Sequence, residues 1–506
     1  MPSETDNVIS PPPGAEPTVP APDPDAAPPR ERAVEIAQTI LTGLILAFIF
    51  RAFLIEPFII PTGSMADALL GAHATRTCPA CGCEFDFAPL RTDASPAAGF
   101  IRPREIVCPN CQLRFEPTAE DTAPKAGDRV LVHKWPCVLG LFKPQRWDVI
   151  VFRDPADPDQ HYIKRVVALP NETIEIVDGD VFINNEIVRK PPHVQRVMWH
   201  VVFDQAHLAN PHAKSGRWPR WVTRDAPAPN GAGWSGMDSR VIHYDGPDST
   251  PRTLAFNADV GPDYLMDLYA YDRGSSGTMI GDVRIVSDVS IARGGGYIRW
   301  ELVRSPYRYA TTLRADGTVT LEMGPSDGST DMQTVATCTR PPFSPDRPIA
   351  LEFGHVDYRI YVRLDGDEIL FTERSPDIDE VLRYASRRPI AIRVAAADIA
   401  LDLRGLRIDR DVHYTHSLYS QRAQAGHAFT LRGDEYFVLG DNSPDSHDSR
   451  EWTGRGPHLP SDYRPGTVLE DQIVGQAAFV YLPGLLPLDG AGRWAIPDIG
   501  RVRFVR

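Results

Sequence analysis

The sequence is short of positive charge. Its 506 residues include 53 lysines and arginines against 67 aspartates and glutamates, which gives a formal net charge of −14. A surface with this balance repels phosphate backbones, so it argues against a general nucleic-acid binder. We therefore expect no nucleic-acid partner.

Large apolar side chains are almost absent from the first 29 residues, which repeat proline, alanine, aspartate and glutamate. Such a segment cannot bury enough surface to offset the entropy lost on ordering. We predict that residues 1–32 form a disordered tail. The whole chain is 42% hydrophobic and too long for one ordinary core, which indicates two to four domains.

Polar residues are scarce between Ile36 and Ile55. About 20 apolar residues at ~1.5 Å each cover the core of a bilayer. We predict a single membrane helix over residues 33–55, in preference to a buried globular helix or a cleaved signal peptide, because no Ala-x-Ala site follows. Arg30 and Arg32 precede the apolar run, which favours an N-terminus inside the cytoplasmic membrane and everything from Glu56 onward outside it.

Two short segments suggest a nucleophile and a base. Ser64 lies in the rigid turn Pro61–Met65, directly after the apolar run. Lys164 lies in a strand-like run, where alternation puts it on the same face as Tyr162 and Val166. Lysine is rarely buried in this way. A turn serine and a half-exposed, salt-bridged lysine are the alternatives that require no chemistry.

A buried lysine can act as a general base if burial lowers its pKa from about 10.4. Serine–lysine pairs are a known variant of the Ser-His-Asp arrangement. A third polar segment, Gly440–Arg450, follows the predicted strand Glu435–Leu439 and could orient the lysine. Its His447 leaves a Ser-His-Asp triad with Ser64 open.

These segments, in this order behind an N-terminal anchor, resemble the type I signal peptidases. The matching stretches are Glu56–Met65, Gly127–Val132, Arg146–Phe152, Tyr162–Pro170, Gly440–Arg450 and Val474–Ala477. The resemblance implies a membrane-bound serine endopeptidase that removes signal peptides from exported preproteins at the outer face of the cytoplasmic membrane. Its partners would be signal peptides and the bilayer, and its catalysis would need no cofactor. The catalytic domain would be split into residues 56–190 and 425–506.

The resemblance also assigns roles to single residues. It implies that Ser64 is the nucleophile, that Lys164 is the general base, and that Ser446 orients Lys164. The Ser64 N–H and the Thr62 hydroxyl would form the oxyanion hole. The remaining implied residues are an ion pair and the lining of the substrate pocket: Asp448 and Arg450, then Phe58, Ile60, Met65, Tyr162 and Ile163.

One departure from the family pattern follows the nucleophile. The family usually has a proline shortly after the serine and methionine, whereas this chain continues Ala66-Asp67-Ala68-Leu69. Either the turn is looser without the proline, or something later in the chain compensates for it.

Cysteine is also scarce, with seven in the chain, but four of them are grouped. Cys78 and Cys81 form one Cys-x-x-Cys pair, and Cys108 and Cys111 form another. This spacing is typical of a closed, structural zinc site, which we favour over disulfides. We predict a zinc-ribbon-like insertion over residues 72–120. Cys83 would be spare, and Cys137 and Cys338 would be ordinary buried cysteines.

The family pattern is absent from residues 191–424. After an irregular Pro/Trp/Gly-rich part, we expect short strands at 283–286, 297–302, 309–313, 318–323, 349–353, 358–364, 368–371, 390–394 and 399–408. Asp316-Gly317 and Asp365-Gly366 are typical hairpin turns. The pattern predicts an inserted, jelly-roll-like β-sandwich, and Gly405–Val412 resembles the last strand of lectin-like folds. The whole chain is thus predicted to be mainly β. A catalytically inactive, membrane-tethered protein that displays this sandwich is the alternative function.

Overall fold

The computed structural model describes residues 29–49, 54–87, 90–91, 100–101, 106–116, 125–134, 140, 143–208, 221–223, 233–257, 271, 280–343, 347–385, 390–417, 420–483, 485–487, 495–497 and 499–505. The chain divides into two compact units, residues 1–54 and 55–506. Most of the predicted tail and Cys137 lie outside the described residues.

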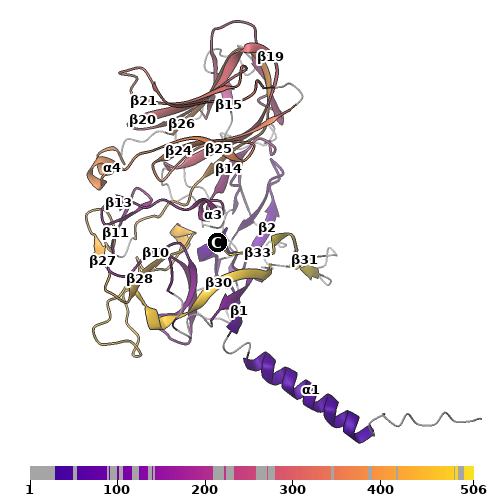
Figure 1. Ribbon diagram of the computed structural model, residues 1–506, viewed down its shortest axis with the longest axis vertical. Helices are drawn as coiled ribbons and strands as arrows, with labels where there is room; N and C mark the ends of the chain where they lie inside the picture. The colour runs from indigo at the N-terminus through magenta and orange to yellow at the C-terminus, as the bar shows by residue number, and fades with distance from the viewer. Residues whose placement is uncertain are drawn as a thin grey trace, which may run out of the picture. The chain divides into compact units, whose positions relative to one another are not determined.

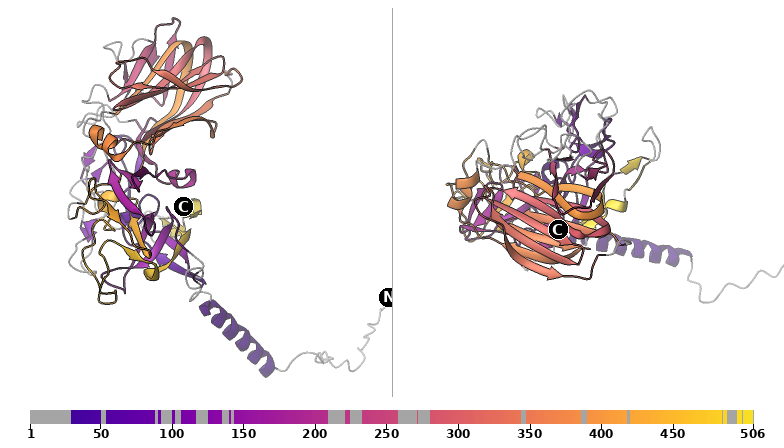
Figure 2. Two further views of the ribbon diagram at one scale, coloured as in Figure 1. Left: turned by 60° about the vertical axis from the view of Figure 1, so that its left-hand side comes forward. Right: turned by 90° about the horizontal axis from the view of Figure 1, so that it is seen from above.

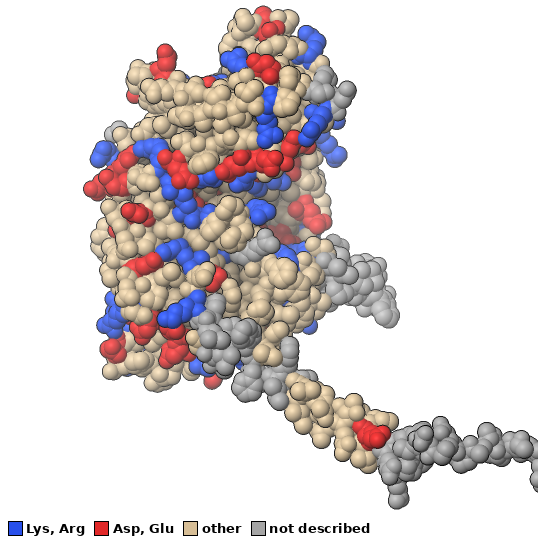
Figure 3. Space-filling view, in the orientation of Figure 1, with Lys and Arg blue, Asp and Glu red and all other residues tan. Residues whose placement is uncertain are grey.

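The first unit contains one helix, α1 (Pro29–Ile49), seen at the lower right of Figure 1. The helix begins inside the segment predicted to be disordered and ends before Ile55. Its described surface is almost free of charged side chains in Figure 3, with apolar side chains such as Ile36 and Phe48 more than half exposed. Nevertheless, none of the helices described is both long and apolar enough to cross a membrane. The predicted membrane helix over residues 33–55 is thus not found among the described residues.

The second unit is mainly β, as predicted. An antiparallel sheet runs in the order β1-β8-β30-β9-β10-β28-β29, with β33 beside β30 (Figure 1). Alternate residues of β9 supply two cores: Val149 and Val151 pack on one face, and Ile150 and Phe152 on the other. The strands are β1 (Ile55–Ile59), β8 (Arg129–His133), β9 (Val149–Arg153), β10 (His161–Ala168), β28 (Glu435–Leu439), β29 (Val468–Leu469), β30 (Ile473–Leu482) and β33 (Arg503–Phe504).

A smaller antiparallel sheet, in the order β13-β12-β11-β27, follows β10 along the chain. Its first hairpin turns at Asp178 and Gly179, whose φ angles of 55° and 89° suit a tight hairpin turn. The elements are β11 (Thr173–Val177), β12 (Asp180–Ile183), β13 (Glu186–Ile187), β27 (Phe429–Thr430) and the short helix α3 (Pro192–Gln195). Three more two-stranded or helical pieces complete this part: β31 (Leu485–Pro487) with β32 (Ala495–Pro497), η5 (Glu470–Gln472) and η6 (Ile499–Arg501).

The segment with the paired cysteines consists of short two-stranded sheets. These are β2 (Ala74–Thr77) with β3 (Glu84–Phe87), β4 (Leu90–Arg91) with β5 (Phe100–Ile101), and β6 (Ile106–Val107) with β7 (Arg114–Phe115). Its core is small and includes the four paired cysteines themselves, together with Phe85 and Phe87. So few apolar residues argue that something other than packing stabilises this segment.

Residues 200–410 form a 13-stranded sheet that folds over into two layers, which we call the two-layer sheet (Figure 2). Two long strands, β19 (Val283–Arg304) and β26 (Ile390–Arg410), pair with each other along nearly their full length and pass from one layer to the other. The other elements are β14 (His200–Asp204), β15 (Trp221–Thr223), β16 (Trp234–Ser235), β17 (Val241–Gly246), β18 (Arg252–Phe256), β20 (Tyr307–Arg314), β21 (Thr318–Pro325), β22 (Gln333–Thr339), β23 (Ile349–Val356), β24 (Arg359–Leu364), β25 (Asp367–Glu373) and α4 (Ile378–Ala385).

The strand predictions for this region need two corrections. The predicted pairs 283–286 with 297–302 and 390–394 with 399–408 are each one continuous strand, because bulges near Gly294 let the ladder bend without breaking. The part expected to be irregular contains β14 to β18. The turns at Asp316-Gly317 and Asp365-Gly366 do join β20 to β21 and β24 to β25. Cys338 lies half-buried in β22, against the main core.

Charged side chains of both signs gather in a band across the face shown in Figure 3, at the level of β14, β24 and β25. The band includes alternating ion pairs on neighbouring strands, such as Arg359 with Glu368 and Arg363 with Glu352. Their signs balance, so this face has no strong net charge.

Candidate active site

The predicted nucleophile lies in a tight, buried turn. Ser64 is the middle residue of η2 (Gly63–Met65), which follows β1, and it is 6% exposed. The Ala66 N–H closes the turn by donating to the Gly63 carbonyl at 3.0 Å. Thr62 stands just before η2 with an extended backbone, is exposed to solvent, and makes no capping hydrogen bond with its side chain.

Lys164 reaches this turn from β10. Its Nζ lies 2.5 Å from Ser64 Oγ, in a buried hydrogen bond that joins residues 100 positions apart. The strand register places Lys164 opposite Ile150 and Tyr162 opposite Phe152, so the lysine emerges from an apolar face, as the alternation predicted. Burial lowers the pKa of Lys164 to about 8, although the nearby Asp448 carboxylate opposes this shift. A substantial fraction of the lysine is therefore neutral near pH 8.

The loop after β28 holds the nucleophile turn in place. The Asn442 N–H donates to the Ser64 carbonyl at 3.1 Å, and its side-chain Nδ2 donates to the Gly63 carbonyl at 3.2 Å. Asn442 lies within the matching segment Gly440–Arg450, but the sequence indicated no role for it. Its only signal was its place in a polar loop after a buried strand.

The same loop carries Ser446, Asp448 and Arg450, all buried. Arg450 pairs with Asp448 at 2.7 Å, and the Ser446 hydroxyl donates to the same carboxylate at 2.7 Å. Burial would raise the pKa of Asp448, but Arg450 and these hydrogen bonds hold it below its usual value. Two further oxygens, the Thr415 carbonyl and the Ser443 hydroxyl, accept hydrogen bonds from Arg450 at 2.6 Å. The predicted ion pair is thus present in the structure.

Ser446 was expected to orient Lys164. The hydrogen bond found for its hydroxyl goes to Asp448 instead. The hydroxyl nevertheless lies close to the nucleophile, because a β-carbon added at Gly440 would collide with both the Ser446 side chain and the Ser64 carbonyl. Gly440 therefore allows the loop to pack directly against the nucleophile turn.

A second buried ion pair fixes β10 to this loop. Arg165, next to the lysine, is fully buried and makes two hydrogen bonds of 2.7 Å to the Asp441 carboxylate. It also donates to the Trp147 carbonyl at 2.7 Å. Two parallel hydrogen bonds between an arginine and a carboxylate fix the relative orientation of the two groups and also stabilise the pair. No pattern in the sequence distinguished Arg165 from a solvent-facing arginine.

The alternative triad is not formed. His447 is exposed, and its ring lies edge-on to Trp452 with centroids 6.5 Å apart. Among the described residues, the Ser64 hydroxyl is hydrogen-bonded to Lys164. The structure thus places Lys164, and not His447, beside the Ser64 hydroxyl.

The predicted pocket residues fall into two groups. Ile60, Met65 and Ile163 are buried in one core with the partly buried Phe58. Tyr162 belongs to the other core and stacks on Trp452, with ring planes 6° apart. Ile60 and Met65 are 2% and 0% exposed, so they support the turn from below in this structure.

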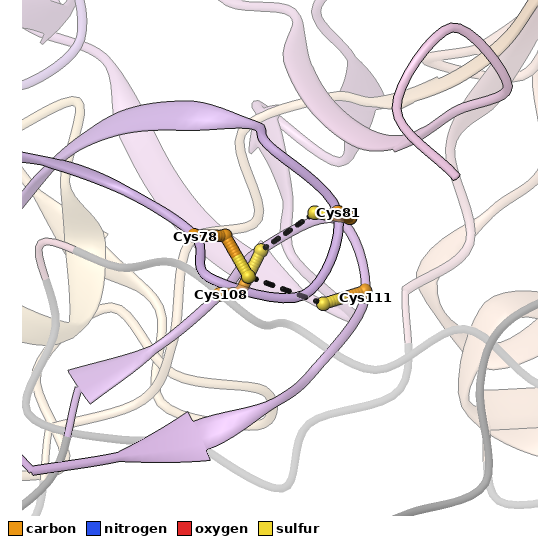
Figure 4. Close-up of side chains that lie close together, drawn as sticks. All are labelled: Cys78, Cys81, Cys108 and Cys111. Carbon is orange, nitrogen blue, oxygen red and sulfur yellow. Dashed lines mark hydrogen bonds between the residues drawn. The ribbon is translucent and has the colours of Figure 1, made fainter. Parts of the chain in front are cut away.

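The four paired cysteines converge on one point, as Figure 4 shows. The Cys78 and Cys111 sulfur atoms are 3.6 Å apart, those of Cys81 and Cys108 are 3.7 Å apart, and all four lie within 4.8 Å of one another. These separations are far from the ~2.05 Å of a disulfide. They fit a tetrahedron with metal–sulfur bonds of about 2.3 Å, whose sulfur atoms are about 3.8 Å apart.

The two Cys-x-x-Cys turns have the same backbone. The Cys78 N–H donates to the Cys83 carbonyl, and the Gly82 N–H donates back to the Cys78 carbonyl. The second turn repeats this pattern around Cys108, with donors and acceptors at equivalent positions. Cys83 lies outside the cluster and is half-exposed. The residues present therefore suit a closed site for one metal ion.

Two segments of the chain are similar to a known family. The model of the family "Signal peptidase, peptidase S26" matches residues 114–213 and 381–482. The first segment contains Lys164, and the second contains Ser446, Asp448 and Arg450. Ser64 precedes both. The predicted resemblance to type I signal peptidases is thereby confirmed.

Individual relatives cover less of the chain. Signal peptidase I of Pseudomonas fluorescens is 28% identical over 166 residues, which is 31% of this chain and 39% of the relative. Signal peptidase I of Rickettsia typhi is 27% identical over 145 residues, 29% of this chain and 41% of the relative. The chain thus spans about two fifths of the curated relatives it matches. A carbohydrate binding module, CBM66 from Bacillus subtilis, covers 37% of this chain at 12% identity with a TM-score of 0.24, too low to carry an argument.

Proposed function

Because the chain carries both matched segments of the peptidase S26 family, we propose that it is a serine endopeptidase that removes signal peptides from exported preproteins. The observation that carries this proposal is the buried hydrogen bond between Lys164 Nζ and Ser64 Oγ. The base is buried and has a lowered pKa, as a general base near neutral pH requires. An intact pair of this kind argues against an inactive scaffold.

The chemistry follows from the geometry of the pair. Ser64 Oγ attacks the scissile carbonyl carbon while neutral Lys164 takes its proton. The ammonium then gives that proton to the leaving amine, which departs and leaves an acyl-enzyme. Lys164, again neutral, removes a proton from water, the hydroxide attacks the ester carbonyl, and the returned proton restores Ser64.

The developing oxyanion needs donors. We assign this role to the Ser64 N–H and the Thr62 hydroxyl. Thr62 lies immediately before the nucleophile, is open to solvent, and does not cap the turn. A donor of this kind contributes about 3 kcal/mol to the transition state.

The test is cleavage of a preprotein by the purified full-length chain. Ser64→Ala should abolish cleavage, whereas Ser329→Ala, an exposed serine of the two-layer sheet, should cleave like the wild type. A substrate-derived acyl group should be recoverable on Ser64 after rapid acid quenching. Cleavage by Ser64→Ala at the wild-type rate would refute the proposal.

We also propose that α1 brings the enzyme to a lipid bilayer, where exported preproteins emerge. Its apolar side chains from Val34 to Phe48 are exposed, and an apolar surface of this extent usually has an apolar partner. Flotation of the full-length chain with liposomes should depend on α1. A variant with Ile36, Leu41 and Leu44 replaced by serine should remain in the aqueous fraction.

The four paired cysteines are proposed to hold a structural zinc ion. The fit of their sulfur separations to a tetrahedron supports this assignment. Purified chain should contain about one zinc per molecule, and Cys78→Ser should lose it while Cys338→Ser keeps it. Absence of both metal and free thiols from the wild type would indicate disulfides instead.

A further inference from the structure

The turn after the nucleophile lacks the proline that the family usually has. It continues with Ala66 and Asp67, so its own sequence supplies no rigid residue there. Asn442 holds one side of the turn through the Gly63 and Ser64 carbonyls. The opposite side must also be supported, because small displacements of a nucleophile are costly for the reaction.

That support comes from a residue between the two segments that the family model matches. Tyr271 is 1% exposed and packs with Ala66 and Leu70 in a small buried cluster. Its ring occupies the space where a side chain at Gly63 would be, since a β-carbon added there would overlap the ring. The aromatic ring thus lies directly against the backbone of the nucleophile turn.

Hydrogen bonds fix the position of this ring. The Tyr271 hydroxyl lies 3.1 Å from both the Gly71 and the Ala72 carbonyl oxygens, to which it can donate. Burial raises the pKa of Tyr271, so the hydroxyl stays a neutral donor at every pH at which the enzyme would work. Both ends of the segment from Gly63 to Ala72 are therefore in contact with one side chain.

A second contact, from a residue inside the first matched segment, lies nearby. His200, at the start of β14 and 4% exposed, has its Nδ1 3.0 Å from Asp67 Oδ2. Asp67 stands where the family pattern has its more rigid continuation. Tyr271 and His200 thus both contact the segment that directly follows Ser64.

We propose that Tyr271 is a positioning residue for Ser64, and that the region between the two matched segments thereby forms part of the peptidase active site. Tyr271 does not touch the reacting atoms. It holds the backbone of the nucleophile turn against the dyad, with His200 as a lesser support, and so replaces the missing proline. This inference rests on the proposed peptidase function.

The test compares variants of the full-length chain in preprotein cleavage. Tyr271→Ala removes the ring and should lower kcat on the order of 100-fold, with KM nearly unchanged, because the serine is misplaced while the substrate still binds. Tyr271→Phe keeps the ring against Gly63 and should retain most of kcat. Tyr244→Ala is the matched control, since Tyr244 is equally buried but lies in the core of the two-layer sheet. It should lower the melting temperature without lowering kcat of the folded enzyme.

The outcomes separate the two proposals. A wild type that fails to cleave, or a Ser64→Ala variant that cleaves normally, would refute the peptidase function itself. If those controls behave as expected, a wild-type kcat for Tyr271→Ala would overturn the role of Tyr271 alone. So would a loss confined to KM, or an equal loss of kcat in Tyr244→Ala. If Tyr271→Ala does not fold, Tyr271→Leu takes its place, and a Leu variant as active as the Phe variant would overturn the proposal.

Discussion

Two lysines among the described residues have buried side chains, and their surroundings shift their pKa values in opposite directions. Lys164 is 3% exposed, and the side chain of Lys190 is 3% exposed. Burial lowers the pKa of Lys164 to about 8. Burial acts in the same direction on Lys190, but contacts with Asp357 and Asp411 outweigh it and raise its pKa well above the usual value.

The difference lies in how the neighbouring carboxylates are occupied. Asp411 Oδ2 lies 2.9 Å from Lys190 Nζ, and Asp357 is closer still. Near Lys164 the main carboxylate is Asp448, and it is already paired with Arg450 and accepts from Ser446. Burial lowers the pKa of Lys164, beside a carboxylate that is already paired with Arg450. Lys190 instead lies beside two carboxylates that it pairs with itself.

The largest expected difference between the two lysines is in preprotein cleavage, and replacing each lysine by methionine tests it. Lys164→Met should lower preprotein cleavage by about 10²–10⁴-fold, the usual contribution of a general base. Lys190→Met should leave kcat of the folded enzyme close to that of the wild type. Steady-state kinetics on both variants checks this, and similar losses in the two would mean that Lys164 has no special role.

The effect on the free energy of unfolding should be large for Lys190→Met, the variant whose kcat is expected to stay close to that of the wild type. Lys190→Met leaves Asp357 and Asp411 buried beside each other without their cation, which should cost about 3–5 kcal/mol of unfolding free energy. Urea unfolding followed by fluorescence measures this loss. Lys143→Met, at an exposed lysine, is the control and should change stability little. A stability unchanged in Lys190→Met would show that its ion pairs are absent in solution.

The pH dependence should distinguish the two lysines. Only neutral Lys164 can act as the base, so kcat/KM should rise with pH, reach half its maximum near pH 8 and then level off. The free energy of unfolding should gain from Lys164 as pH rises from 8 to about 10.4, because the unfolded chain binds more protons there. The Lys190 contribution is present below about pH 10.4 and is lost only as pH rises through its higher folded pKa. A midpoint of kcat/KM near pH 10 would contradict the assignment.

The smallest expected effect comes from making the surroundings of Lys164 more like those of Lys190. Arg450→Gln removes a cation that lowers the pKa of Lys164 and frees the Asp448 carboxylate. The midpoint of the kcat/KM profile should move to higher pH, with a loss of about tenfold at most at pH 7, where less lysine is neutral. Arg432→Gln, at a half-exposed arginine, should leave the midpoint in place. A shift to lower pH would show that Arg450 is not the controlling charge.

The sequence was sufficient to predict where Ser64 and Lys164 lie, because both residues belong to short local patterns. Alternation placed Lys164 on an apolar face, and the Pro/Gly turn placed Ser64 at a bend, as the structure has them. The two Cys-x-x-Cys pairs are an equally local pattern. Their spacing predicted a converging cluster, and the four sulfur atoms do converge.

Contacts between distant segments could not be predicted in this way. Tyr271 packs against Gly63 across a region with no family pattern, and nothing around it in sequence marks it. The continuous strands β19 and β26 were divided in prediction because glycines and polar residues at their bends look like turns. The membrane helix was predicted from apolar composition over residues 33–55, and no helix among the described residues meets that prediction.

The order in which the site is made has a consequence during synthesis. Asn442 donates to the Gly63 carbonyl across 379 positions. The turn that contains Ser64 is therefore synthesised long before the loop that holds it. Chains emerge from the ribosome N-terminus first, so a segment cannot form hydrogen bonds to residues that have not yet been synthesised. A growing chain therefore displays Ser64 and Lys164 long before the loop that aligns them exists. The proposed cleavage activity can begin only after that loop has been synthesised.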